Sequence, residues 1–213
     1  MSSGERSSAR LFVAVDPPAE VCRELGGWAR AVAAEGFAGA AGRPRAHQRG
    51  GPAHPELRVL DAEGLHITLC FLGSRPVEEI EELSFAVTSC SGEVDELSVG
   101  APLWLPPRHP RALAVEIHDA SGELERLQRE LTAALRDAVD WQPGHRRFRA
   151  HLTVARIRGR DVPAAVLAGA LGGAATPPLH FAPRSLTLYR SRLDPSGATY
   201  EALASRPLAP GAV

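Results

Sequence analysis

The pattern His-x-Thr-x occurs twice in this chain, each time inside an apolar segment. The copies read His66-Ile67-Thr68-Leu69 and His151-Leu152-Thr153-Val154. Such apolar and β-branched surroundings favour strands, and in a strand residues i and i+2 face the same side. Each copy therefore presents an imidazole and a hydroxyl side by side, while its apolar residues face the other way. Because burying an unpaired histidine costs free energy, two such copies in core strands are hard to attribute to chance.

These residue types suit chemistry at phosphorus. Histidine has an unperturbed pKa near 6.5, so two facing imidazoles can act as base and acid in one step. Threonine hydroxyls can donate hydrogen bonds to the nonbridging oxygens of a bound phosphate. The four side chains together predict an in-line displacement, in which one histidine activates water and the other protonates the leaving oxygen.

A metal-dependent site is the main rival interpretation. The chain contains no H-E-x-x-H, no H-x-H and no Cys/His cluster at ligand spacing. We therefore expect no metal and no other cofactor. The chain also contains no lysine, which excludes lysine nucleophiles, Schiff bases and the phosphate-binding lysine of a P-loop.

Hydrophobic periodicity predicts a mixed order of strands and helices. Asp16 is expected to cap the first helix, with Pro17 at its first helical position, and Pro76 to begin the second. Ser121 is expected to open the third helix, and residues 164–171 to form a short fourth one. The expected strands are Leu11–Val15, Leu57–Leu60, Leu65–Leu72, Val94–Val99, Leu103–Leu105, Ala112–Ile117, Phe148–Ile157, Leu179–Phe181, Ser185–Tyr189 and Ala198–Leu203.

A coarse repeat divides the chain, because in each half a long helix precedes a strand that carries the motif. This order favours two similar α+β lobes. We expect one domain over residues 10–206, between disordered tails at residues 1–9 and 207–213. Residues 36–56 are rich in glycine and proline and show no periodicity, which predicts a flexible insertion.

Composition limits the partners and the compartment. The formal charge is −1, from 24 basic and 25 acidic residues, so any nucleic-acid contact should be local. Three cysteines without a C-x-x-C spacing favour a reducing compartment. The N-terminal residues show no signal peptide, and we see no membrane span. We expect a cytoplasmic monomer that does not bind membranes.

The chain resembles the bacterial and archaeal RNA 2′,3′-cyclic phosphodiesterases of the two-histidine phosphoesterase superfamily, historically called 2′-5′ RNA ligases. Nearly the whole chain takes part in the resemblance, through four segments in the family's order. These are Arg10–Val15, Leu65–Gly73, Phe148–Arg156, and Leu188–Leu193 with Gly197–Tyr200.

The resemblance implies a bilobal α+β fold with antiparallel sheets around a central cleft. It also implies that His66 is the proton donor and His151 the proton acceptor, and that the product carries a 2′-phosphate. The expected substrate is an RNA with a 2′,3′-cyclic phosphate end, or a small cyclic nucleotide. Two alternatives stay open: an ATP-independent 2′-5′ RNA ligase using the same site in reverse, and a non-catalytic RNA-end binding protein.

Several other residues are candidates for substrate binding. Arg156 is the strongest candidate among the arginines, since the family keeps an arginine there. Strict strand alternation places it on the face opposite His151 unless a bulge intervenes. Its neighbours among the arginines near the second motif form either an electropositive rim or an arginine-rich surface. The remaining candidates are Phe71, Phe148, Tyr189 and Arg190, with core packing the commoner role for the two phenylalanines. Alternation also places Cys70 on the face of His66, where we expect it to pack.

Overall fold

A single antiparallel sheet forms the centre of the molecule. The computed structural model describes residues 7–38, 56–144, 147–158, 162, 164–171, 175–194 and 197–208. Within these ranges the strands follow the order β7-β4-β5-β6-β3-β1-β8-β9, and β2 also pairs with β6. The strands are β1 Ser8–Asp16, β2 Glu56–Val59, β3 Ile67–Pro76, β4 Leu97–Leu105, β5 Ala112–His118, β6 His151–Arg158, β7 His180–Phe181, β8 Ser185–Asp194 and β9 Gly197–Pro207. The expected α+β class is confirmed.

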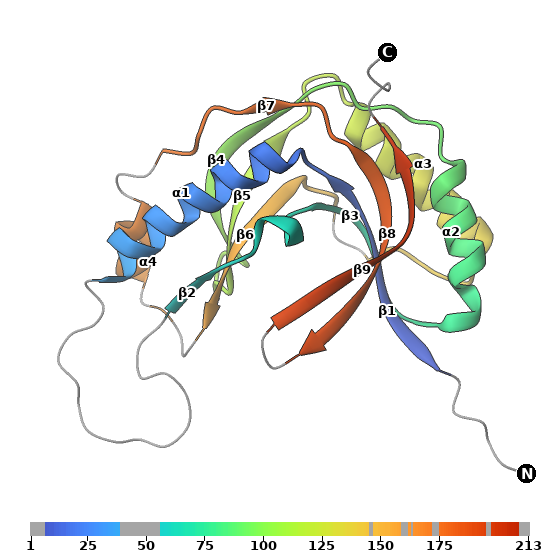
Figure 1. Ribbon diagram of the computed structural model, residues 1–213, viewed down its shortest axis with the longest axis horizontal. Coiled ribbons are helices and arrows are strands. Elements are labelled where there is room, and N and C mark those ends of the chain that lie inside the picture. The colour runs from blue at the N-terminus through green and yellow to red at the C-terminus, as the bar shows by residue number, and fades with distance from the viewer. Residues whose placement is uncertain are drawn as a thin grey trace, which may run out of the picture.

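Two pairs of helices lie at opposite ends of the sheet (Figure 1). They are α1 Ala19–Ala38 with α4 Ala164–Leu171, and α2 Ile80–Ser89 with α3 Glu123–Ala138. The four leucines of α3 form a buried stripe, each 0% exposed: Leu124, Leu127, Leu131 and Leu135. No helix in the described ranges is long and apolar enough to cross a membrane.

Several element boundaries differ from the expected ones because hydrogen bonding extends the strands. β1 begins at Ser8, so Ser8 and Ala9 pair with β3 rather than belonging to a tail. At the other end, β9 includes Pro207, and the amide of Leu208 donates to the carbonyl of Arg184 at 2.9 Å. Pro76 ends β3 and is the N-cap of a 3-10 turn, Val77–Glu79, that continues into α2.

The expected insertion is shorter at both ends. α1 continues to Ala38 and β2 begins at Glu56, while residues 39–55 lie outside the described ranges.

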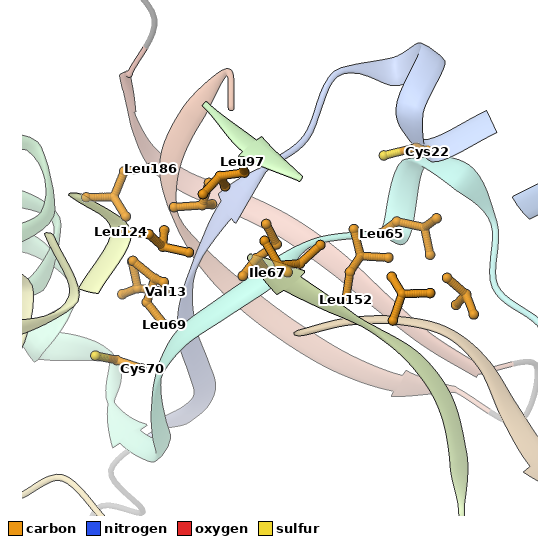
Figure 2. Packing of buried hydrophobic residues seen from close by; sticks show 14 of the residues in the cluster. Val13, Cys22, Leu65, Ile67, Leu69, Cys70, Leu97, Leu124, Leu152 and Leu186 are labelled. Carbon is orange, nitrogen blue, oxygen red and sulfur yellow. The ribbon is translucent and has the colours of Figure 1, made fainter. Parts of the chain in front are cut away.

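The two halves of the sheet meet where the two motifs meet. β3 pairs with β6 through Ile67 opposite Leu152, and both side chains are 0% exposed. Figure 2 shows these two residues beside each other within the core. The strands of the two lobes are therefore continuous through this pair, which lies between the histidine and the threonine of each motif.

A bulge in β6 interrupts the alternation just after the second motif. Against β5, Thr153 pairs with Ala114 whereas Ala155 pairs with Leu113, so Val154 is an extra residue. Val154 and Ala155 are consequently both part of the buried core. The following residue, Arg156, returns to the face that carries the motif.

β3 has the same irregularity after the first motif. Against β1, Thr68 pairs with Ala14 and Cys70 with Val13, which leaves Leu69 as the extra residue. Leu69 and Cys70 both join the core, and Phe71 emerges on the motif face with 68% of its surface exposed. Simple alternation was therefore wrong for Cys70, which lies on the helix side with its Sγ 3.5 Å from Oγ1 of Thr132.

The junction leads to a prediction about stability. Replacing Leu152 by alanine should lower the free energy of unfolding by about 2–5 kcal/mol, because it removes a fully buried side chain where the halves meet. Urea unfolding should still show one transition, since the sheet is continuous. The control is Phe85→Ala, which removes a side chain that is 74% exposed and should change stability by about 0.5 kcal/mol or less. Two separate transitions, or a Leu152→Ala loss as small as the control's, would contradict this role of the junction.

Candidate active site

The four motif side chains form a compact block on one face of the sheet. Because Ile67 lies opposite Leu152 in an antiparallel pair, the register places His66 across from Thr153, and Thr68 across from His151. The two histidines thus occupy one diagonal of the block and the two threonines the other. Diagonal neighbours in a sheet lie about 7–8 Å apart, so the side-chain tips can converge on one small group.

Both imidazoles are held in the same way. Nδ1 of His66 lies 2.8 Å from the carbonyl oxygen of Gly64, and Nδ1 of His151 lies 2.8 Å from the carbonyl oxygen of Arg149. A carbonyl only accepts, so each Nδ1 is the protonated nitrogen. Nε2 is then the nitrogen left to take or give a proton in each ring.

Each histidine has a carboxylate residue opposite it on the neighbouring strand. Glu116 of β5 is opposite His151, and continuing the register from Val15 and Ile67 places Asp16 opposite His66. Glu116 forms an ion pair with Arg149. The two carboxylates occupy equivalent positions, so the internal repeat extends beyond the motifs.

Asp16 does not cap a helix, contrary to the expectation. α1 begins only at Ala19, and the Asp16 carboxylate instead accepts hydrogen bonds from three side chains of β8. The hydroxyls of Ser185, Thr187 and Tyr189 lie 2.8, 2.6 and 2.9 Å from its oxygens. The carboxylate therefore ties the end of β1 to β8 beside His66.

Aromatic rings surround His66 and leave His151 in more polar surroundings. The Phe12 ring stacks on His66 with centroids 4.8 Å apart, and the Tyr200 ring meets His66 edge-on at 5.0 Å. Tyr189 lies 6.1 Å from His66 and stacks on Phe12 at 5.3 Å. The rings come from β1, β8 and β9, which lie next to one another in the sheet.

This environment shifts the pKa of His66. Burial lowers it below the ordinary value of 6.5, and electrostatic interactions with Arg156 and His151 lower it further. The hydrogen bond to the Gly64 carbonyl and the charge of Asp16 act in the opposite direction without cancelling the burial effect. His66 is therefore neutral in the free protein at neutral pH.

Three of the other candidates lie on the same face as the histidines. The bulges bring Arg156 and Phe71 there, each five residues after its motif histidine. Tyr189 also faces this side, since it pairs with Phe12.

Two candidates lie elsewhere. Arg190 pairs with Leu11 on the helix side, where its Nη1 is 3.6 Å from Glu201. Phe148 is partly buried and packs against the core. The structure does not bring these two side chains to the block.

Sequence reasoning missed Phe12, Asp16, Glu116 and Tyr200 as members of this site. Their positions depend on which strands pair and in what register, which local periodicity does not specify. One signal was available: Phe12 and Tyr200 both lie within the segments that carried the family resemblance.

A hollow between α2 and α3 lies on the helix side of the sheet, away from the motif block. Its wall includes Phe85, Cys90 and Glu130. Burial raises the pKa of the Cys90 thiol to about 11, so the thiol stays protonated and is a poor nucleophile. Among the described residues, no three His, Cys, Asp or Glu side chains gather as a metal site would require.

Comparisons with known proteins agree with this architecture. The model of the 2′-5′ RNA ligase superfamily matches residues 17–195. E. coli LigT, solved in complex with 3′-AMP, superposes with a TM-score of 0.65 and 25% identity, covering 95% of this chain and 99% of that chain. TT0787 of Thermus thermophilus gives a TM-score of 0.66 with 24% identity, covering 93% of this chain and 97% of that chain.

A further solved structure, described as a phosphoesterase, has a TM-score of 0.64 and 22% identity, with 95% of this chain and 99% of that chain covered. No curated protein sequence matches the chain. The motif block, the continuous antiparallel sheet and the length of the family match agree with one another, and the chain belongs to the 2′-5′ RNA ligase superfamily.

Proposed function

We propose that this protein hydrolyses 2′,3′-cyclic phosphate ends of RNA to 2′-phosphate ends, with His66 and His151 as acid and base. The observation that carries the proposal is the motif block, with histidines on one diagonal and threonines on the other. An in-line displacement needs a base and an acid on opposite sides of phosphorus, and donors for the two nonbridging oxygens. LigT from E. coli has been solved with 3′-AMP, which supports a nucleotide as the ligand.

The reaction balances with these groups alone. Nε2 of His151 takes a proton from water as the water oxygen bonds to phosphorus. The bond between phosphorus and the 3′ oxygen breaks, and Nε2 of His66 delivers its proton to that oxygen. A 3′-hydroxyl and a 2′-phosphate result, and the next cycle begins once the proton held by His151 has passed to His66 through solvent.

The assignment of acid and base follows the family resemblance, and the environments are compatible with it. The free protein disfavours a charged His66 because of burial. A phosphodiester anion beside that ring favours the charged form, so His66 takes up its proton as substrate binds. The aromatic shell then holds the charged ring away from bulk water, where its hydrogen bond to the leaving oxygen is stronger.

The rest of the face supplies substrate contacts. Thr68 and Thr153 bind the nonbridging oxygens, and Arg156 adds charge near the same phosphate, consistent with its effect on His66. The exposed ring of Phe71 offers a surface on which a base can stack. Tyr189 acts indirectly, since its hydroxyl is occupied by Asp16 and its ring supports Phe12.

A change of leaving group should distinguish the roles of the two histidines. On a nucleoside 2′,3′-cyclic phosphate, His66→Ala and His151→Ala should each lower kcat by about 10² to 10⁴. On an analogue with sulfur in place of the bridging 3′ oxygen, His66→Ala should recover most of the wild-type rate, because a thiolate leaves without a proton. His151→Ala should stay impaired on both compounds. Phosphorus NMR follows the rates and identifies the 2′-phosphate product.

His180→Ala is the matched control, since it removes an exposed histidine on β7 that lies 3.6 Å from Glu96. It should behave as wild type. Equal rescue of both active-site variants would refute separate acid and base roles. Rescue of His151→Ala alone would reverse the assignment.

The pH dependence should follow the charges around His66. As the acid, His66 must be protonated, so kcat/KM falls as pH rises through its pKa, which lies below 6.5 in the free protein. Asp16→Asn removes a charge that raises this pKa and should move the fall to lower pH. Arg156→Gln removes a charge that lowers it and should move the fall to higher pH, besides reducing the rate. Profiles of kcat/KM across the acidic and neutral range measure the shifts; movement of both variants in one direction would contradict the proposal.

A further inference from the structure

Two arginines face each other beyond the motif block. In the short ladder between β2 and β6, Arg58 lies directly opposite Arg156. Their neighbours Leu57, Ala155 and Ile157 all belong to the core on the helix side, so both arginines point to the face that carries the histidines. Like charges directly opposite each other in a sheet are destabilising, so this pairing calls for a compensating anion.

No protein group in the described ranges supplies that anion to Arg58. Its side chain is half-buried, yet it forms no hydrogen bond or ion pair with any described residue. Its guanidinium lies against the backbone of β9, since a β-carbon on Gly197 would be 2.8 Å from Nη1 and 3.0 Å from Nη2. Gly197 has a φ of +140°, so both its conformation and the space beside it require glycine.

Arg58 lies to one side of the motif block, opposite Arg156 and next to β9. Arg156 is three positions after Thr153 along β6, which corresponds to at most about 10 Å at roughly 3.3 Å per residue. Arg156 is among the charged groups that lower the pKa of His66. The guanidinium of Arg58 lies beside Gly197 at the start of β9.

We propose that Arg58 is a selectivity residue that binds a second phosphate of the substrate, the one on the 5′ oxygen of the terminal nucleoside. The inference rests on the proposed function, which places the cyclic phosphate of the same nucleoside at the histidines. An arginine fork matches two phosphate oxygens. The site then favours an RNA end, or a nucleotide with a 5′-phosphate, over a nucleoside cyclic phosphate that lacks one.

Binding of two product-like nucleotides tests this independently of turnover. Adenosine 2′-phosphate and adenosine 2′,5′-bisphosphate differ only in the second phosphate, and calorimetry gives the Kd of each. Wild-type protein should bind the bisphosphate about tenfold more tightly, which corresponds to about 1.4 kcal/mol. Arg58→Gln should bring the ratio of the two Kd values close to one. Arg58→Lys should give an intermediate ratio, because lysine keeps the charge without the fork.

Arg23→Gln is the control for net charge, since Arg23 is exposed on α1. It should leave the ratio at the wild-type value, and the Tm of Arg58→Gln should match that of Arg23→Gln. A wild-type ratio near one, no binding of the bisphosphate, or a tenfold ratio that survives in Arg58→Gln would each overturn the inference. A lower Tm in Arg58→Gln with an unchanged ratio would instead make Arg58 a structural contact to β9.

Turnover measured in parallel separates the two proposals. If adenosine 2′,3′-cyclic phosphate is not hydrolysed but the Kd ratio depends on Arg58, the hydrolase proposal fails and the second phosphate site stands. If hydrolysis occurs and the ratio does not depend on Arg58, the hydrolase stands and this inference fails.

Discussion

The pairing of Ile67 with Leu152 is the contact on which the rest of the molecule depends. It joins the two halves of the sheet and buries both side chains completely. The same pairing brings the two motifs into contact in antiparallel register, so the residues on either side of it become neighbours on the opposite face. The core and the candidate active site are therefore two sides of one strand pair, and a change in its register would disturb both.

The motif block is nearly symmetric, but its two histidines have different surroundings. Both histidines donate from Nδ1 to a carbonyl two residues earlier, and each lies across from a carboxylate. Beyond these carbonyl and carboxylate neighbours the symmetry ends. Aromatic rings surround His66, whereas the Glu116–Arg149 ion pair lies next to His151. Burial among these rings lowers the pKa of His66, because its charged form would lose hydration there.

Sequence patterns predicted the motif strands and the α+β class because these depend on local periodicity and apolar burial. Such local patterns do not specify which strands pair or in what register. Arg156 and Phe71 reach the site through bulges that appear only once β6 and β3 are laid against β5 and β1. Asp16 looked like a helix cap because its role depends on β8, which is remote in the chain: the separation from Thr187 is 171 residues.

The paired bulges have a consequence for how the sheet assembles. An ordinary strand can slide by two residues along its neighbour and keep the same side chains on the same face, so a short ladder is prone to such slippage. A strand with an extra residue fits its neighbour in one alignment only, because the bulge must meet its own gap in the ladder. Leu69 and Val154 therefore act as register locks on either side of the junction. They fix β3 against β1 and β6 against β5, on the two sides of the short direct ladder between β3 and β6.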